Sequence, residues 1–226
     1  MTGNLNPMQK IDLHTHVPKS NSSIQILNAF AQDLPIADDQ NLYSAGLHPW
    51  HLARVNPEEC LDLLARAMTQ KNMVAMGECG LDRFTPADFA IQEWYFKKQI
   101  KIAQEHSKPL IIHCVRAFSE LIRLKKEFKT TIPWIIHGYQ ANVQTTLQLA
   151  RHHFYFSLGE SMLSHPLKKE IVQFIPSDHL FLETDDSEIS IDQIYSLAAQ
   201  ELKMDVQTLV GIVFENFHRL FGNPRN

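Results

Sequence analysis

The sequence predicts an α/β fold, a distorted TIM-type (β/α)8 barrel that occupies residues 1–226 as a single domain. Short runs rich in Ile, Val, Leu and aromatic residues recur along the chain, and in its second two-thirds longer segments of helical period separate them. Strands that alternate with helices are typical of a parallel sheet. Eight such runs in 226 residues fit one closed barrel in both number and length.

Eight apolar runs are the predicted strands. In chain order they are Lys10–His14, Ile24–Phe30, Leu42–Gly46, Met73–Gly77, Pro109–His113, Pro133–His137, Phe154–Leu158 and Leu180–Glu183. Nine residues separate the first run from the second, and about eleven separate the second from the third. A crossover with a helix needs a dozen residues or more. We therefore expect the first two crossovers to be trimmed and the barrel to be distorted there.

Helical period is clearest in three later segments. The first two span 56–70 and 86–106, and the third begins after Asp205, a good N-cap residue, and carries one apolar stripe. In the second segment, Thr85 and Asp88 have the spacing of a capping box, and a proline stands at the first helical position. These helices are expected to cover the barrel.

Composition and charge limit the classes of function and the cellular compartments that the sequence fits. Hydrophobic residues make up 44% of the chain, enough for a large core. The net charge of −4 and a pI near 6.3 provide no general positive field for nucleic acid, so charge for phosphate chemistry must be local. Three cysteines in no zinc-type spacing argue against a disulfide framework and for the cytoplasm. No leader or membrane-spanning run is evident, so no membrane partner is expected.

Residues of the metal-binding type stand at the ends of five predicted strands. They are His14, His16, Glu78, His113, His137 and Asp185. In a barrel, the carboxyl ends of all strands meet at one mouth, and side chains two apart on a strand point to the same side. Four imidazoles and two carboxylates are about what two divalent ions need when they share one bridging carboxylate.

Each of these residues also has a purely structural interpretation. An isolated His-x-His is usually an accident, and His113 and His137 could simply hydrogen-bond the barrel rim. The acidic run 183–186 could begin a helix, since Asp favours N-cap positions. Chance histidines, however, need not fall at the same end of successive strands. The conjunction favours a metal centre.

Seven segments together resemble the TatD family of metal-dependent deoxyribonucleases, within the amidohydrolase-like barrel superfamily. They are IDLHTH (11–16), GLHP (46–49), GECGLD (77–82), PLIIH (109–113), HGY (137–139), LFLETD (180–185) and ENFHRLF (215–221). The resemblance implies a distorted TIM barrel with a binuclear site. Family members are described as divalent-metal-dependent nucleases, many of them 3′ to 5′ exonucleases on DNA.

The resemblance also implies a ligand assignment. His14, His16 and Asp185 would hold one ion, His113 and His137 would hold the other, and Glu78 would bridge them. Three departures from the family pattern leave these ligands intact and alter the surrounding loops. Ala141 stands where the family often has a glycine four residues after the histidine of HGY. The ETD leads almost directly into a helix, and an arginine after PLIIH comes one place late.

These residues predict hydrolysis of a phosphodiester by a metal-activated hydroxide, with Asp185 taking up the proton of the attacking water. The expected cofactors are two divalent ions, Mg, Mn or Zn, and the expected partner is DNA, bound transiently as substrate. Two alternatives stay open. One is an amidohydrolase-type enzyme acting on a lactone, amide or small phosphoester, and the other is a metal-binding protein without turnover.

Five further residues are predicted to support this chemistry. Arg83 and Arg116 follow the strand ends closely and could pair with a phosphate. His48 in GLHP is expected either to face the leaving group or to fix the turn made by Pro49 and Trp50. Asp12 lies on the same strand face as His14 and is expected to orient it, and Asp82 is expected to support the ligands from just beyond Glu78.

Overall fold

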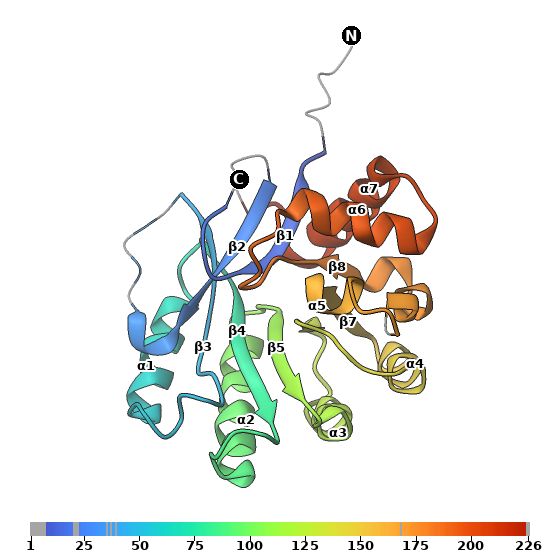
Figure 1. Cartoon of the computed structure of the whole chain (residues 1–226). Helices are drawn as coiled ribbons and strands as arrows, with labels where there is room; N and C mark the ends of the chain where they lie inside the picture. The colour runs from blue at the N-terminus through green and yellow to red at the C-terminus, as the bar shows by residue number, and fades with distance from the viewer. Residues whose placement is uncertain are drawn as a thin grey trace.

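The computed structural model describes residues 8–19, 23–34, 36, 38, 40–167 and 169–224. Within them, eight strands form one sheet in chain order, and each strand pairs in parallel with the next. Figure 1 shows the helices arranged around the outside of these strands. The strands are β1 (Lys10–Thr15), β2 (Ser23–Phe30), β3 (Leu42–Gly46), β4 (Met73–Asp82), β5 (Leu110–Val115), β6 (Trp134–Ile136), β7 (Phe154–Leu158) and β8 (Leu180–Leu182).

The barrel closes between its first and last strands at the carboxyl ends. Just beyond β8, Asp185 forms a parallel bridge with Thr15 of β1. The Asp185 N–H donates to the carbonyl of His14 at 2.9 Å, and the His16 N–H donates to the Asp185 carbonyl at 3.3 Å. The predicted α/β barrel is therefore confirmed.

Helices follow the third strand and every later one. They are α1 (Pro57–Ala67), α2 (Phe89–Glu105), α3 (Phe118–Phe128), α4 (Val143–Arg151), α5 (Glu160–Leu163), α6 (Ile191–Leu202) and α7 (Val206–Phe221), with 3-10 turns η1 (Ala31–Asp33), η2 (Lys169–Phe174) and η3 (Ser177–His179). In the described part of the first two crossovers, η1 is the only helical turn. The predicted trimming is confirmed. No described helix combines the length and apolar character that crossing a bilayer requires.

Helix starts agree with the sequence in one case and differ in another. Asp205 caps α7, as predicted, by accepting from the Thr208 N–H at 2.9 Å. The capping box predicted at Thr85 is wrong, because α2 begins at Phe89 and Asp88 is its N-cap. The preceding residues form a loop instead, because the Gln92 side chain donates to the carbonyl of Ala87 at 2.8 Å.

Local irregularities in β1 and β4 lie at candidate ligands. The β1–β2 register shifts between Asp12 and Thr15, and the β4–β5 register shifts between Met76 and Cys79. These intervals contain His14 and Glu78, and such irregularities re-aim the side chains they include. In β4, a Cβ at Gly77 would lie 2.3 Å from the carbonyl oxygen of Ile111. Only glycine permits this close approach of β5.

Candidate metal centre

The carboxyl ends of β1, β4, β5, β6 and β8 bring all six candidate ligands to one place. His14 is fully buried, and the other five line a cavity of about 350 Å³. The barrel topology explains this convergence, because parallel strands all end at the same mouth. The cavity-lining ligands are His16, Glu78, His113, His137 and Asp185.

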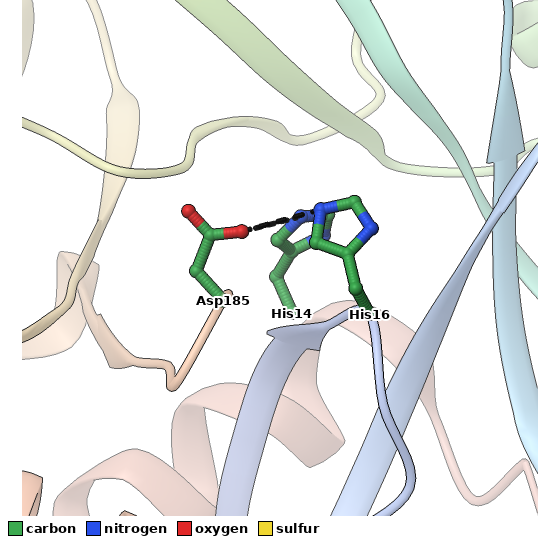
Figure 2. Close-up of side chains that lie close together, drawn as sticks. All are labelled: His14, His16 and Asp185. Carbon is green, nitrogen blue, oxygen red and sulfur yellow. Dashed lines mark ion pairs between the residues drawn. The ribbon is translucent and has the colours of Figure 1, made fainter. Parts of the chain in front are cut away.

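His14, His16 and Asp185 form one group of candidate ligands. Figure 2 shows both imidazoles directed at the same carboxylate. Oδ1 of Asp185 lies 3.5 Å from Nε2 of His14 and 3.3 Å from Nε2 of His16. One ligand atom from each residue lies within 4.8 Å of the other two. The three side chains are close enough to hold a single ion.

Glu78 lies between this group and a second pair of imidazoles. Its Oε2 is 3.7 Å from Nε2 of His14 and 3.5 Å from Nε2 of His16. Its Oε1 is 2.7 Å from Nε2 of His137 and 3.6 Å from Nδ1 of His113. Each carboxylate oxygen thus faces its own set of imidazoles, which is the arrangement a bridging ligand needs.

Unsatisfied polar atoms show that these residues fit a metal. Both ring nitrogens of His14 and of His137 are buried and have no hydrogen-bond partner among the described residues. Buried polar groups without a partner are costly, and a bound cation would satisfy the lone-pair nitrogen of each ring. Imidazole nitrogens suit Zn, Mn, Fe or Ni, and carboxylate oxygens also suit Mg.

The carboxylates of the centre are held in their charged form. Burial acts to raise the pKa of Glu78, but the charge of His137 and the nearby imidazoles of His113 and His48 outweigh it and hold that pKa well below its ordinary value. Burial is likewise outweighed at Asp185, where the nearby imidazoles of His14 and His16 lower the pKa. Both groups are anionic at neutral pH, as metal ligands must be.

His48 enters the cavity as a neutral donor. Its Nδ1 accepts a hydrogen bond from the Trp50 N–H at 3.1 Å, so its proton lies on Nε2, which is 3.5 Å from Oε1 of Glu78. Burial lowers the pKa of His48 to about 4, despite the nearby carboxylate. His48 therefore lines the cavity and has an Nε2–H that can donate a hydrogen bond.

The two predicted arginine contacts do not line the cavity. Arg83 forms an ion pair with Glu120, and its guanidinium packs 4.2 Å from the centre of the Phe89 ring. Arg116 packs its guanidinium 4.9 Å from the centre of the Phe84 ring. Aromatic and acidic neighbours hold both side chains outside the cavity, and their contact with a substrate phosphate remains a prediction.

Asp12 and Asp82 differ in what they support. Asp12 is expected from the sequence to orient His14, but no hydrogen bond joins the two described side chains. Asp12 instead accepts from the N–H and hydroxyl of Thr184 at 2.9 and 2.7 Å. Burial raises its pKa to about 6. Asp82 lies 3.0 Å from Nε2 of His113 and orients that ring. Burial acts to raise the pKa of Asp82, but hydrogen bonds, the strongest from His113, lower it to about 2.

Two supporting residues were missed in the sequence. Oδ1 of Asn28 accepts from the Glu78 N–H at 2.9 Å, and its amide lies 3.5 Å from Oε2 of the same residue. Oε1 of Glu183 accepts from the Gly138 N–H at 2.5 Å and lies 3.7 Å from Nδ1 of His137. A polar residue in or directly after an apolar strand run indicates a supporting residue of this kind. Such a residue is expected to be buried, and buried polar groups need hydrogen-bond partners.

A barrel whose mouth gathers imidazoles around a buried carboxylate defines the class of metal-dependent hydrolases built on this fold. Comparison with known proteins narrows the class. The family model of TatD related DNases matches residues 11–222. The chain is 30% identical over 200 residues to YabD of Bacillus subtilis, described as an uncharacterized metal-dependent hydrolase, with 80% of this chain and 77% of that protein covered.

A solved structure and a more distant relative are also similar to this chain. The crystal structure of YjjV, a TatD homologue of Escherichia coli, superposes with a TM-score of 0.82 at 20% identity and covers 96% of this chain and 99% of that one. A putative deoxyribonuclease TATDN1 homologue of Enterocytozoon bieneusi is 26% identical over 167 residues, 70% of this chain and 60% of that protein. This chain belongs to the TatD-related DNase family of metal-dependent hydrolases.

Proposed function

We propose that this protein is a deoxyribonuclease that hydrolyses phosphodiester bonds from the 3′ end of DNA. The observation that carries the proposal is the position of Glu78, whose two oxygens face separate sets of imidazoles. A bridging carboxylate at this position suits a pair of divalent ions. When bound, such ions would activate a water molecule and stabilise the charge that develops on the phosphate.

The proposed ligand sets follow the two sides of Glu78. His14, His16 and Asp185 would hold one ion, and His113 and His137 would hold the other. The neighbouring side chains keep these groups in place, since Asp82 contacts His113 and Glu183 lies against His137. Mg, Mn and Zn all suit this mixture of nitrogen and oxygen ligands.

Two residues are proposed to handle protons and substrate. The Asp185 side chain is about one-third exposed to the cavity, so its carboxylate can accept a proton from an attacking water and deliver it to the leaving oxygen. A positioned group of this kind contributes about 10²–10⁴-fold to the rate. His48 can donate its Nε2–H to a phosphate oxygen, because it is neutral and lies in the cavity.

DNA is the proposed substrate and a transient partner. The chain has a net charge of −4 and few cations near the cavity, so binding would depend on a few phosphate contacts and weaken strongly with salt. The proposed place of action is the cytoplasm, since Cys60, Cys79 and Cys114 are all free thiols.

A substrate panel tests the proposed function. Protein loaded with Mg, Mn or Zn is incubated with 5′-labelled single-stranded DNA, a short RNA, an aryl phosphodiester and a set of lactones. We expect progressive shortening of the DNA from its 3′ end. Turnover of lactones with no cleavage of any phosphodiester would overturn the proposal in favour of an amidohydrolase.

A further inference from the structure

A second hollow adjoins the metal cavity at the end of β4. It has a volume of about 290 Å³, near the lower end of the range for small-molecule sites, about 300 Å³. Trp50 and His51 line both the cavity and this hollow, so the two spaces are neighbours. Arg54, Asp82 and Phe84 also line the hollow. We call it the side hollow.

The side hollow is bordered by two exposed aromatic side chains. Trp50 is 54% exposed and Phe84 is 69% exposed. A single exposed aromatic residue is ordinary, but here two of them border one concave space beside a proposed catalytic centre. Aromatic faces in such a position are suited to stacking against flat rings, and stacking on nucleobases tolerates any base sequence.

Asp82 ties these aromatic residues to the metal centre. Its Oδ2 accepts from the indole Nε1 of Trp50 at 2.7 Å, and its Oδ1 accepts from the backbone N–H of Phe84 at 2.7 Å. The same carboxylate lies 3.0 Å from Nε2 of His113. One buried residue thus fixes the indole, the Phe84 backbone and a candidate metal ligand relative to one another, and such preorganisation lowers the cost of binding.

Charge also favours this side of the mouth for a polyanion. Arg116 packs against Phe84, and Arg54 forms no ion pair with any residue that the structure describes. Asp185 and Asp186 line the cavity but not the side hollow. The phosphates of a strand that leaves the cavity would be attracted toward the two arginines at the side hollow.

We propose that Trp50 and Phe84 form a stacking subsite for an unpaired nucleobase of the nucleotides joined by the scissile phosphodiester. The inference rests on the proposed function and narrows its substrate to the single-stranded ends of nucleic acids. A base held in a duplex is paired and stacked on its neighbours, so it cannot enter the side hollow without being released from its partner.

A cycle that combines removal of the base with removal of the aromatic side chain tests the subsite. The values of kcat/KM are measured for a single-stranded oligonucleotide and for the same strand with abasic residues at its last two 3′ positions. In the native protein, loss of the bases should lower kcat/KM by about 5- to 150-fold, the range for stacking one base. In Phe84→Ala, which removes one of the two aromatic faces, this ratio should fall clearly below the native value.

Two variants sharpen the comparison. Phe84→Trp keeps an aromatic face and should retain the native dependence on the base. Trp94→Ala removes an equally exposed aromatic residue, 59% exposed on α2, that lines neither hollow, and it should show the native ratio. A Phe84→Ala protein that depends on the base as strongly as the native one would overturn the stacking subsite.

A binding measurement separates this inference from the proposed function. Fluorescence anisotropy of labelled oligonucleotides with metal-free protein requires no hydrolysis. We expect the normal strand to bind more tightly than the abasic strand, and we expect Phe84→Ala to reduce this difference. If no phosphodiester is cleaved, the proposed function fails and this measurement still decides the subsite. Cleavage and binding that both ignore the base would overturn the subsite alone.

Discussion

Oε1 of Glu183 lies 3.7 Å from Nδ1 of His137, on the side of the ring away from Glu78. The same oxygen accepts the N–H of Gly138, so the carboxylate fixes both the imidazole and the turn that follows it. The Glu183 side chain is fully buried, and its Oε2 has no partner among the described residues. A carboxylate behind a metal-binding imidazole orients the ring and increases its basicity.

Glu183→Gln should weaken metal binding without unfolding the protein. The amide retains an acceptor for Gly138 but removes the negative charge beside His137, and loss of such a partner typically costs about 10- to 100-fold in metal affinity. Isothermal titration with Mn or Zn gives the affinity. Glu188→Gln, at an exposed position nearby, is the matched control. Equal affinities in the two variants would contradict the role given to Glu183.

The native protein should bind about two divalent ions per chain, since six ligands exceed the needs of one tetrahedral site. His14→Ala and His113→Ala, which affect opposite sides of Glu78, should each lose about one ion. Elemental analysis after loading and desalting gives the metal content, and His106→Ala, at the half-buried C-cap of α2 and outside the ligand set, is the control. A native protein that retains no metal after careful loading would refute the ligand assignment.

Asp185→Asn should lower turnover by at least about 10²-fold, the lower end for losing a general base. The backbone of Asp185 has a φ of 52°, and asparagine tolerates this region well. The hydrogen bonds that join this residue to β1 are made by its backbone and persist. The metal content of the variant is measured beside its rate, with Asp62→Asn on α1 as control. Near-native turnover with full metal content would exclude Asp185 as the proton acceptor.

Gly77→Ala should destabilise the barrel by about 2–5 kcal/mol, the combined cost of an unfavourable backbone angle and overpacking. The φ of Gly77 is 155°, and an added Cβ would lie 2.3 Å from a backbone oxygen of β5. Gly211→Ala in α7 is the opposite case, because among the described residues the added Cβ meets only the Met8 sulfur, at an ordinary contact distance of 3.6 Å. It should stabilise the protein by about 0.4–1 kcal/mol. Urea unfolding of both variants checks the contrast.

Lys125 should make stability depend on pH in the alkaline range. Burial lowers its pKa from 10.5 to about 8, and its Nζ donates to the His153 carbonyl at 2.6 Å. Between these pH values the unfolded chain binds a proton that the folded chain has released, so stability rises with pH. Below pH 8, Lys125 is protonated in both states and its burial is a constant cost.

Lys125→Met isolates this contribution. The free energy of unfolding is measured by urea denaturation at pH values below, within and above the window. The advantage of the methionine variant over the native protein should shrink as pH rises from about 8 to 10.5. Lys126→Met, at an exposed neighbouring position, should show no such trend. A constant difference between Lys125→Met and the native protein would contradict the prediction.

The positions of the candidate ligands could be predicted because strand ends are marked by local composition. His14, His113 and His137 each end an apolar run, and parallel strands bring such ends together whatever the details of packing. The start of α2 could not be predicted in the same way. Gln92 holds the loop before the helix by donating to the carbonyls of Asp82 and Ala87, and this contact exists only in the folded chain.

The contact partners of long side chains also could not be predicted from the sequence. Arg83 follows the strand that carries Glu78, which makes it a reasonable phosphate ligand. In the folded chain it forms an ion pair with Glu120 of α3. Asn28 was passed over because its run is otherwise a typical strand, and its contact with Glu78 depends on the register of β2, β3 and β4. Non-local contacts of this kind are set by tertiary packing, which local patterns do not specify.

The bridge between Thr15 and Asp185 gives the proposed metal a second role, in holding the fold together. The ligands His14 and Asp185 belong to opposite ends of the chain, and they meet where the first strand joins the last. An ion shared by them would be a cross-link that closes the loop from residue 14 to residue 185, about three-quarters of the chain, and the entropy of loop closure grows with loop length. Removal of the ion would then lower the free energy of unfolding, while the backbone hydrogen bonds that join Asp185 to β1 remain.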